Sequence, residues 1–582
     1  MIPEKATILA GNIHHGLLAC VIMLTLSTGC GKETLSGSDS PDTPPPVFSG
    51  PDPNINLDVR KLAAEADSYS ITYGALTPAT INTLKTYPLV IVHPYNGDVT
   101  RDQIMQIKQG VKADDPSDNV VVLCYISVGE DSRTYQLTDA EMRADTRFTG
   151  DGSGPVIDPR GPGPSGRALT GLNPKGTATN GGFASYYLND NAVRCTGEPD
   201  KSPDQNGNFL TRFVNAGDPA WYETVRDMQM NINTHTQPGL QELFTETSGR
   251  GLGCDGIFLD TIDTAAPNKY TSCSDSNHSS SEWTAKGFSD FIRRVRADYP
   301  DKVILQNRGL FFFDPREPHY QVSARGAIDI GYFESYYLDN DSLTTVSPYF
   351  PDNKYNMTPK IMAEANRPDG FKMLSLGYAN GFEAPKPGLD VQTLLGNLTT
   401  GFETFMDDIG EAYSAGFRHY ITNANVDLVN SFVKDNVTLD DISPPQWSST
   451  YNATYDPPEP PAPRVGIQKV EPQAPGTVTV SWDVALDMNR VSYILYYRTT
   501  PFDFNTDPTL STATSTILTP TAGAGYDAVW SSANPHLALE SVFPYQATLS
   551  GLQAGTAHHF LLRARDSKGN EDDNRIILTA TP

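Results

Sequence analysis

The sequence is poor in basic residues, in cysteine and in long apolar runs. Among 582 residues, 43 Lys and Arg stand against 69 Asp and Glu, and the formal net charge is -26. No basic cluster is longer than a pair, so phosphate is repelled and nucleic acid is not expected as a partner. The six cysteines form no C-x-x-C pair and no His-x-His motif occurs, which argues against metal hydrolysis. We therefore expect no metal and no cofactor.

The apolar run 17–26 is too short to span a bilayer and is typical of an export signal. Residues 26–30 read Leu-Ser-Thr-Gly-Cys, which resembles a bacterial lipobox. We interpret residues 1–29 as a signal peptide and Cys30 as the lipidated residue, with simple secretion as the alternative. Gly31 follows the cysteine, and by resemblance to Gram-negative lipoproteins this favours the outer membrane or cell surface. The lipid would be the chain's contact with a membrane.

Four further cysteines remain: Cys124, Cys195, Cys254 and Cys273. An exported chain can oxidise such an even set. Cys195 and Cys273 fall in loops expected over one face, so we predict a disulfide between them. Cys124 and Cys254 fall in or beside adjacent strands, where free buried thiols are common.

The middle of the chain alternates short apolar runs with helical patterns, following a Ser-, Asp- and Pro-rich tether at 30–57. Eight strands are expected, at 70–73, 89–93, 120–127, 256–260, 303–306, 328–334, 372–378 and 417–422. Such alternation implies right-handed crossovers and a parallel sheet, and eight repeats suit a closed (β/α)₈ TIM barrel at 58–441. Helical spacing supports this, with Phe288, Phe291, Ile292 and Val295 on one face.

Two features interrupt this pattern. The interval between the third and fourth strands is far longer than one crossover helix needs, so an insertion is expected over the carboxyl-end face, where it would wall a cleft. Residues 442–463 are a Pro-rich linker, and the period then changes to two, which predicts an antiparallel sandwich at 464–582. Trp482 and the Arg-Ala-Arg-Asp run at 563–566 resemble a fibronectin type III domain, although His558 stands at the corner tyrosine position. Its role is a spacer or a polymer contact.

Two expected strands end in a carboxylate, Asp260 and Glu334. The carboxyl ends of barrel strands carry the chemistry of this fold, and side chains two strands apart can reach the spacing that glycosidic-bond hydrolysis uses. One carboxyl would stay protonated as the acid, and the other ionised as nucleophile or base. Aromatic neighbours of Glu334 favour the acid role for it. The plainer alternatives are a helix cap for Asp260 and a buried salt bridge for Glu334.

Further polar and aromatic side chains are expected around the same mouth. They could hydrogen-bond sugar hydroxyls or stack on a sugar ring, and the candidates for substrate binding are Tyr125, Ser127, Glu130, Asp263, Asn307 and Tyr378.

Several of these segments resemble the glycoside hydrolase family 114 barrels, which include endo-α-1,4-polygalactosaminidases. The segments are Cys-Tyr-Ile-Ser-Val-Gly-Glu at 124–130, Asp-Gly-Ile-Phe-Leu-Asp-Thr-Ile-Asp at 255–263, Gln-Asn at 306–307 and Phe-Glu-Ser at 333–335. The resemblance implies a glycosidase with Asp260 and Glu334 as its catalytic pair. His93 departs from it, because many members have an acidic residue there.

Both the resemblance and the acidic mouth favour a polysaccharide with free amino groups, such as a galactosamine polymer. The alternative is a surface lipoprotein that binds polysaccharide without cleaving it. The number of subunits is left open by the sequence.

Overall fold

The computed structural model describes residues 50–96, 99–150, 182–188, 202–207, 209–230, 236–244, 251–266, 281, 284–314, 317–339, 346–367, 369–379, 402–436, 444–447, 466–482, 484–487, 491–519, 521–522 and 545–582. Cys30, Cys195 and Cys273 lie outside these ranges, so neither the lipidation site nor the predicted disulfide can be placed. Across the described part, no helix combines the length and apolar character that crossing a membrane requires.

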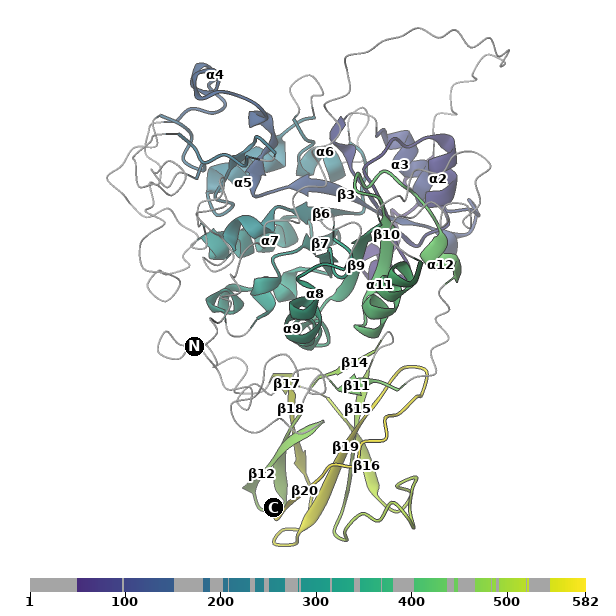
Figure 1. Cartoon of the computed structure of the whole chain (residues 1–582). Coiled ribbons are helices and arrows are strands. Elements are labelled where there is room, and N and C mark those ends of the chain that lie inside the picture. Colours follow the sequence, from purple (N-terminus) through teal and green to yellow (C-terminus); the bar gives the residue numbers. More distant parts are fainter. Residues whose placement is uncertain are drawn as a thin grey trace, which may run out of the picture.

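The first part of the chain is a parallel eight-stranded sheet that curls into a nearly closed barrel (Figure 1). Its strands follow chain order: β1 (Ser70–Thr72), β2 (Leu89–Val92), β3 (Val121–Ser127), β6 (Gly256–Asp260), β7 (Val303–Asn307), β8 (Ile330–Glu334), β9 (Lys372–Tyr378) and β10 (Arg418–Thr422). Near the seam between β1 and β10, the Tyr73 amide donates to the carbonyl of Val426. All eight strands expected from the sequence are confirmed.

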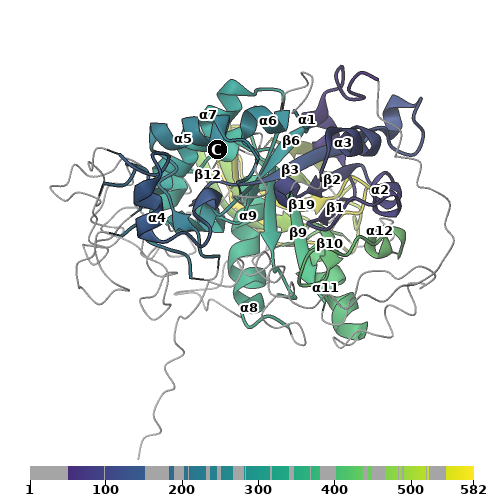
Figure 2. The same ribbon diagram turned by 90° about the horizontal axis from the view of Figure 1, so that it is seen from above.

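Helices surround the strands, as the view from above shows (Figure 2). They are α1 (Val59–Glu65), α2 (Pro78–Leu84), α3 (Arg101–Lys108), α4 (Asp139–Ala144), α5 (Pro219–Asp227), α6 (Leu240–Phe244), α7 (Ala285–Asp298), α8 (Phe350–Asp352), α9 (Thr358–Ala365), α11 (Phe402–Ser414) and α12 (Phe432–Asn436). The helical face predicted in α7 is confirmed, because Phe288, Phe291, Ile292 and Val295 are all buried there. Burial of that face is what fixes α7 against the sheet.

Aromatic rings fill the barrel interior below the mouth. Phe258 contacts Tyr125 and Tyr332 with centroids 5.8 and 5.1 Å apart, and Tyr332 meets Tyr69 at 5.8 Å. Because side chains alternate along a strand, the inward direction of Phe258 also directs Asp260 inward. The same alternation on β8 directs Tyr332 and Glu334 inward. The interior layer thus aims both carboxylates at the mouth.

The insertion between β3 and β6 is tied to the end of β3. Its β5 (Arg212–Phe213) pairs antiparallel with β4 (Glu130–Asp131), which directly follows β3. Gln237 adds a two-point contact, since its side-chain amide donates to the Ser127 carbonyl and accepts from the Ser127 amide. The insertion therefore packs at the carboxyl-end face, as expected.

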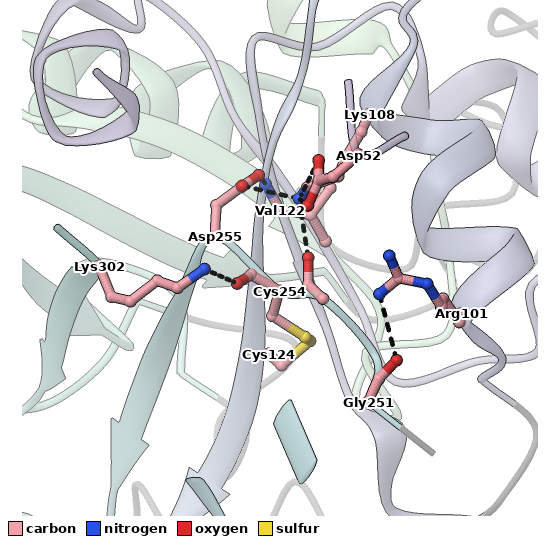
Figure 3. The surroundings of a disulfide bond; sticks show 10 residues. Asp52, Arg101, Lys108, Val122, Cys124, Gly251, Cys254, Asp255 and Lys302 are labelled. Atoms are coloured by element: carbon pink, nitrogen blue, oxygen red, sulfur yellow. Dashed lines mark hydrogen bonds and ion pairs between the residues drawn. A yellow bond between two sulfur atoms is a disulfide. The ribbon is translucent and has the colours of Figure 1, made fainter. Parts of the chain in front are cut away.

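The amino-end face contains a buried ion cluster (Figure 3). The Lys108 ammonium lies 2.6 Å from Asp52 and 2.8 Å from Asp255, and its side chain has no exposed surface. Asn54 donates to Asp255 at 2.8 Å. The segment expected to be a tether up to residue 57 is thus part of the barrel from Asp52 onward, because Asp52 pairs with the buried Lys108 and Asn54 donates to the buried Asp255.

A disulfide joins Cys124 of β3 to Cys254 just before β6, with 6.1 Å between their Cα atoms (Figure 3). The expectation that these two are free thiols is wrong. Adjacent parallel strands bring them within bridging distance. The bond closes a loop that contains the whole insertion.

In the part of the chain that the structure describes from residue 444 onward, the regular elements are all β-strands. One sheet has the order β12 (Ile467–Ala474), β13 (Thr477–Trp482), β18 (Tyr545–Ser550), β17 (Thr521–Ala522). The other has the order β16 (Thr514–Leu518), β15 (Ser492–Arg498), β19 (His558–Arg565), β20 (Ile577–Ala580). A small ribbon pairs β11 (Gln446–Trp447) with β14 (Ala485–Leu486). Every pairing is antiparallel, and Trp482 is fully buried.

This β domain contacts the barrel at the end away from the mouth. The Tyr545 hydroxyl donates to the Ala363 carbonyl, in the last turn of α9, at 3.0 Å. Gly416, which precedes β10 and has φ +89°, lies close against Asp487, which follows β14 of the β domain. A Cβ on Gly416 would lie 2.7 Å from the Asp487 carbonyl oxygen. Both contacts are on segments that lead into the amino ends of β9 and β10. The β domain is thus placed opposite the carboxyl ends of β8 and β9, which carry Glu334 and Tyr378.

Candidate active site

Asp260 and Glu334 meet at one amide. The Asn307 side-chain nitrogen donates to Asp260 Oδ1 at 2.8 Å and to Glu334 Oε2 at 2.9 Å. Those two oxygens are therefore at most about 5.7 Å apart, the length of the two bonds laid end to end. Asn307 ends β7, the strand between β6 and β8. The three strand ends bring together two carboxylates and one shared donor.

Each carboxylate has a second, tyrosine donor. The Tyr125 hydroxyl donates to Asp260 Oδ2 at 2.7 Å, and the Tyr378 hydroxyl donates to Glu334 Oε1. These donors come from β3 and β9, the strands that flank the pair on either side. These four hydrogen bonds thus come from neutral groups, and the charge of Arg308 compensates only part of the negative charge at Glu334.

The environment favours the protonated form of Glu334. Burial, followed by the nearby charge of Asp260, raises the pKa of Glu334 to about 7 against the opposing hydrogen bonds from Tyr378 and Asn307. Burial also raises the pKa of Asp260, while Tyr125 and Asn307 act to lower it. A carboxyl that titrates near neutrality can hold a proton and give it up, as general acid–base chemistry requires.

Backbone strain coincides with these strand ends. Thr261, Arg308 and Ser335 directly follow Asp260, Asn307 and Glu334, and their φ values are 65°, 55° and 59°. The left-handed region is unfavourable for side chains with a Cβ, and most of all for a β-branched threonine. Such strain persists where surrounding contacts hold it, commonly at functional sites.

Asp263 is engaged by the protein itself. Its carboxylate pairs with Arg308 at 3.0 Å and accepts from the Gly309 amide at 2.9 Å. Arg308 also donates to the Glu334 carbonyl oxygen at 3.1 Å. Asp263 therefore fixes the loop after β7 rather than adding free negative charge to the mouth. The sequence analysis did not include Arg308 among the residues of the mouth. Its position directly after Asn307, at the end of an expected strand, was the signal that could have indicated it.

Glu130 is held by the insertion. Asn206 donates to one oxygen at 2.9 Å and Thr211 to the other. Burial raises the pKa of Glu130 to about 7 in spite of these bonds. The residue is 3% exposed and both carboxyl oxygens are bound by the insertion, so Glu130 acts as an anchor for it.

Ser127 also has a structural partner. Its hydroxyl lies 2.9 Å from that of Thr261, which in turn accepts from the Gly129 amide at 2.6 Å. A Cβ on Gly129 would lie 2.1 Å from the Thr261 carbonyl oxygen, so this turn requires glycine. The Ser127-Val128-Gly129 turn thus ties the end of β3 to the end of β6. Of the six candidate binding residues, Tyr125, Asn307 and Tyr378 reach the carboxylate pair directly.

A second group of nucleophile and base types lies outside the mouth. The Ser375 hydroxyl is 2.9 Å from His419, whose other ring nitrogen is 3.0 Å from Asp408. All three are buried between β9, β10 and α11, without exposed side-chain surface at His419 or Asp408. The group joins elements of the fold and is closed to substrate. In the described residues, no cluster of three or more His, Cys, Asp and Glu could hold a metal ion.

Comparison with known proteins gives distant structural likeness alone. No family model matches the chain. No curated protein matches it either. The chain is similar to the glycoside hydrolase domain of PelA from Pseudomonas aeruginosa, with 13% identity and a TM-score of 0.35 over 62% of this chain and 97% of that one. It is also similar to Amy13B of Eubacterium rectale, with 10% identity and a TM-score of 0.28 over 62% of this chain and 68% of that one. A third similar structure is the maltogenic amylase of S. marinus, with 9% identity and a TM-score of 0.29 over 75% of this chain and 63% of that one.

These structural neighbours are glycoside hydrolases, but the TM-scores are too low to bear on function. The fold and the site geometry define a parallel α/β barrel with a buried pair of carboxylates at its mouth.

Proposed function

We propose that this protein is a glycosidase that cleaves a polysaccharide with Asp260 and Glu334. The observation that carries the proposal is the single nitrogen of Asn307 bonded to both carboxylates. The upper limit of about 5.7 Å between the two bonded oxygens allows the separation of about 5–5.5 Å that retaining glycosidases use, and it lies below the 6.5–9.5 Å or so of inverting ones. It favours hydrolysis with retention of configuration.

The two carboxyl groups then have different roles. Glu334, with its pKa near 7, donates its proton to the glycosidic oxygen while ionised Asp260 attacks the anomeric carbon. The bond to the leaving sugar breaks, and that sugar departs with a new hydroxyl group. The Glu334 carboxylate next takes a proton from water, and the resulting hydroxide displaces Asp260 from the glycosyl ester. Asp260 is released as carboxylate and Glu334 is again protonated.

The tyrosines and the amide hold this pair in place. Tyr125 and Asn307 stabilise the ionised form of Asp260, the form that attacks. Tyr378 and Asn307 limit the rise of the Glu334 pKa, so that its proton can still be lost.

An amino-sugar polymer containing galactosamine is the substrate that we propose. The net charge of -26 attracts a cationic polymer to the protein. Support from the mouth is smaller than the sequence indicates, because Asp263 is paired with Arg308 and burial favours the neutral form of Glu130. Long-range attraction therefore acts on the polymer as a whole rather than on one subsite.

We also propose that the protein is an exported lipoprotein, lipidated at Cys30 and located at the outer membrane of a Gram-negative bacterium. The β domain, proposed as fibronectin type III-like, contacts the end of the barrel away from the mouth, which supports a spacer role.

The test is to incubate the full chain with galactosamine polymers of defined acetylation and to follow the first products by proton NMR. We expect new reducing ends whose anomeric configuration equals that of the cleaved linkage, and none with Glu334→Gln. Products of inverted configuration would refute the assigned mechanism. Cleavage of no polymer, with binding intact, would instead support the non-catalytic alternative.

A further inference from the structure

Thr261, the residue directly after Asp260, is held by the turn at the end of β3. Its hydroxyl accepts from the Gly129 amide at 2.6 Å and from the Val128 amide at 3.2 Å. The same hydroxyl donates to the carbonyl oxygen of Asp260 at 2.6 Å. The side chain of Thr261 therefore joins two backbone segments, the turn after β3 and the peptide bond that ends β6.

The peptide bond between Asp260 and Thr261 has a defined orientation. The Val128 amide also donates to the Asp260 carbonyl oxygen, at 3.2 Å, so two donors direct that oxygen toward the end of β3. In a trans peptide the carbonyl and the following N–H point in opposite directions. Burial raises the pKa of Asp260, and the backbone hydrogen bond from Thr261 is one of the contacts that oppose this rise. The Thr261 amide thus acts on the Asp260 carboxylate.

These contacts hold Thr261 in a backbone conformation that glycine adopts more readily. Its φ is 65° and its ψ is 25°, a region that is unfavourable for a β-branched side chain. The common structural use of a threonine before a helix is to cap it, but Thr261 makes no side-chain cap bond to the helical turn Ile262–Ala265. Its hydroxyl is instead bonded to the turn after β3 and to Asp260.

We propose that Thr261 is a positioning residue for Asp260, because its hydroxyl, held by the turn after β3, orients the peptide that aims the nucleophile. This rests on the proposed function. The assignment gives the Ser127-Val128-Gly129 turn a part in the reaction through Thr261. The purely structural alternative is that Thr261 only joins β3 to β6. That alternative predicts a loss of stability with no change in the ionisation of Asp260.

The first test follows the Asp260 carboxyl group itself and does not depend on cleavage. Full-length protein with isotope-labelled aspartate carboxyl carbons is titrated by NMR, and the spectrum of Asp260→Asn identifies the signal of Asp260. In Thr261→Gly we expect its midpoint to move to higher pH, because the amide is no longer held at the carboxylate. Thr261→Ser keeps the hydroxyl and should keep the wild-type midpoint. Neither substitution removes the other titratable groups that act on Asp260, which are Asp263, Glu130, Glu334 and Tyr125.

The second test measures kinetics on a galactosamine polymer that the wild type cleaves. We expect Thr261→Gly to lower kcat by about tenfold or more, with KM changed by less than about twofold, because the nucleophile is misaimed rather than the substrate lost. The acidic limb of kcat/KM should move to higher pH, since Asp260 must be ionised to attack. Thr261→Ser should restore both.

Gln136→Gly is the matched control. Gln136 also has a left-handed backbone, with φ 57°, but it is exposed and lies on the loop that follows Thr134. Its replacement by glycine relieves the same kind of strain without touching the peptide after Asp260. The control should keep the wild-type kcat and the wild-type midpoint of Asp260.

An unmoved midpoint in Thr261→Gly would overturn the proposal, whatever the effect on kcat. Equal shifts in Thr261→Gly and Thr261→Ser would also overturn it, because the hydroxyl would then not be the group that matters. If Thr261→Gly does not fold, Ser127→Ala takes its place, since the Ser127 hydroxyl lies 2.9 Å from that of Thr261. Ser127→Ala should move the midpoint in the same direction by a smaller amount, and an unmoved midpoint there would count against the proposal.

The proposed function can fail separately. If the wild type cleaves no polymer while the midpoint moves in Thr261→Gly and stays in Thr261→Ser, Thr261 still positions the Asp260 carboxyl and the glycosidase assignment falls. If the wild type cleaves and Thr261→Gly keeps both its midpoint and its kcat, the assignment of Thr261 alone is wrong.

Discussion

Strand β6 has a carboxylate at each end, and the protein treats the two in opposite ways. At the amino end, Asp255 lies 2.8 Å from the Lys108 ammonium and accepts from the Val122 amide. At the carboxyl end, Asp260 has hydroxyl and amide donors and a second carboxylate, Glu334, on the same amide. The first carboxylate is neutralised by a cation, and the second faces another acid.

The difference separates stability from chemistry. A buried ion pair is costly to break because removal of one partner leaves an uncompensated charge. At the mouth the two carboxyl groups repel each other, and burial raises the pKa of both. The charge of Arg308 opposes only a smaller part of the rise at Glu334. The amino-end face should therefore control folding, while the mouth should control activity with little contribution to folding.

The largest effect is expected at the mouth. Asp260→Asn removes the nucleophile, and we expect kcat/KM to fall at least about thousandfold while the melting temperature stays the same or rises. Reducing-end release and thermal unfolding are measured on one preparation. Asp298→Asn is the matched control with unchanged activity, because it alters an aspartate at the end of α7 that accepts a hydrogen bond from Tyr222 of α5, away from the mouth. An active Asp260→Asn would remove Asp260 from the pair.

The amino-end face should show the reverse behaviour. Lys108→Met leaves Asp52 and Asp255 buried without their cation, and we expect a loss of about 3–5 kcal/mol in unfolding free energy. Activity per folded molecule should be retained. Lys286→Met removes an exposed pair with Asp290 and should cost less than about 1 kcal/mol. Equal denaturation midpoints for the two variants would contradict the comparison.

The disulfide should contribute to the same face. We expect the Cys124→Ser/Cys254→Ser double variant to lose about 2–4 kcal/mol, because the bond closes a long loop in the unfolded chain. Chemical denaturation with and without reductant measures this, since reductant should lower the wild type and leave the variant unchanged. Alkylation of Cys124 in native, unreduced protein would show that the bond does not form.

A smaller effect is expected from Tyr378→Phe. Its hydroxyl favours the Glu334 carboxylate, so its loss should raise the Glu334 pKa further and move the alkaline limb of the kcat/KM profile to higher pH. The rate at the optimum should change by a few-fold. Tyr222→Phe loses a comparable bond to Asp298 and should keep the wild-type profile. A limb that moves to lower pH would mean that Tyr378 stabilises the protonated acid.

Much of the architecture was readable from local sequence patterns. Buried strand runs and turn signals predict the eight strands, and the strand-end rule places Asp260 and Glu334 at one mouth. Hydrophobic spacing also predicts one helical face from Ile104, Ile107 and Val111, and this is wrong at its end, because α3 stops at Lys108 and Val111 is 62% exposed. Hydrophobic spacing alone does not show where a helix ends.

Pairings between distant segments were harder to predict. The Arg308–Asp263 pair and the insertion's bonds to Glu130 join residues whose sequence spacing carries no periodic signal. The same is true of the Cys124–Cys254 bond, which depends on strand register rather than on cysteine spacing. The number of acidic residues expected at the mouth therefore overestimates the negative charge available to a substrate, because Asp263 is paired with Arg308 and Glu130 is bound by the insertion. Geometry was needed to separate the charges that are neutralised from those that remain.

The most direct test of this account compares Glu334→Gln with the wild type for activity and for stability across pH. The folded pKa of Glu334 is about 7 and its ordinary value is 4.5, so the folded protein binds more protons than the unfolded chain between these values. Wild-type stability should therefore fall as pH rises through this window. Glu334→Gln should lack that fall.

At pH 8 we expect Glu334→Gln to be inactive and more stable than the wild type by about 1–3 kcal/mol, with the difference reduced at pH 4. Loss of one hydrogen bond at the new amide, about 1 kcal/mol, offsets part of the gain. An active Glu334→Gln protein that is less stable at pH 8, as Lys108→Met should be, would contradict the account, because Glu334 would then be a structural carboxylate.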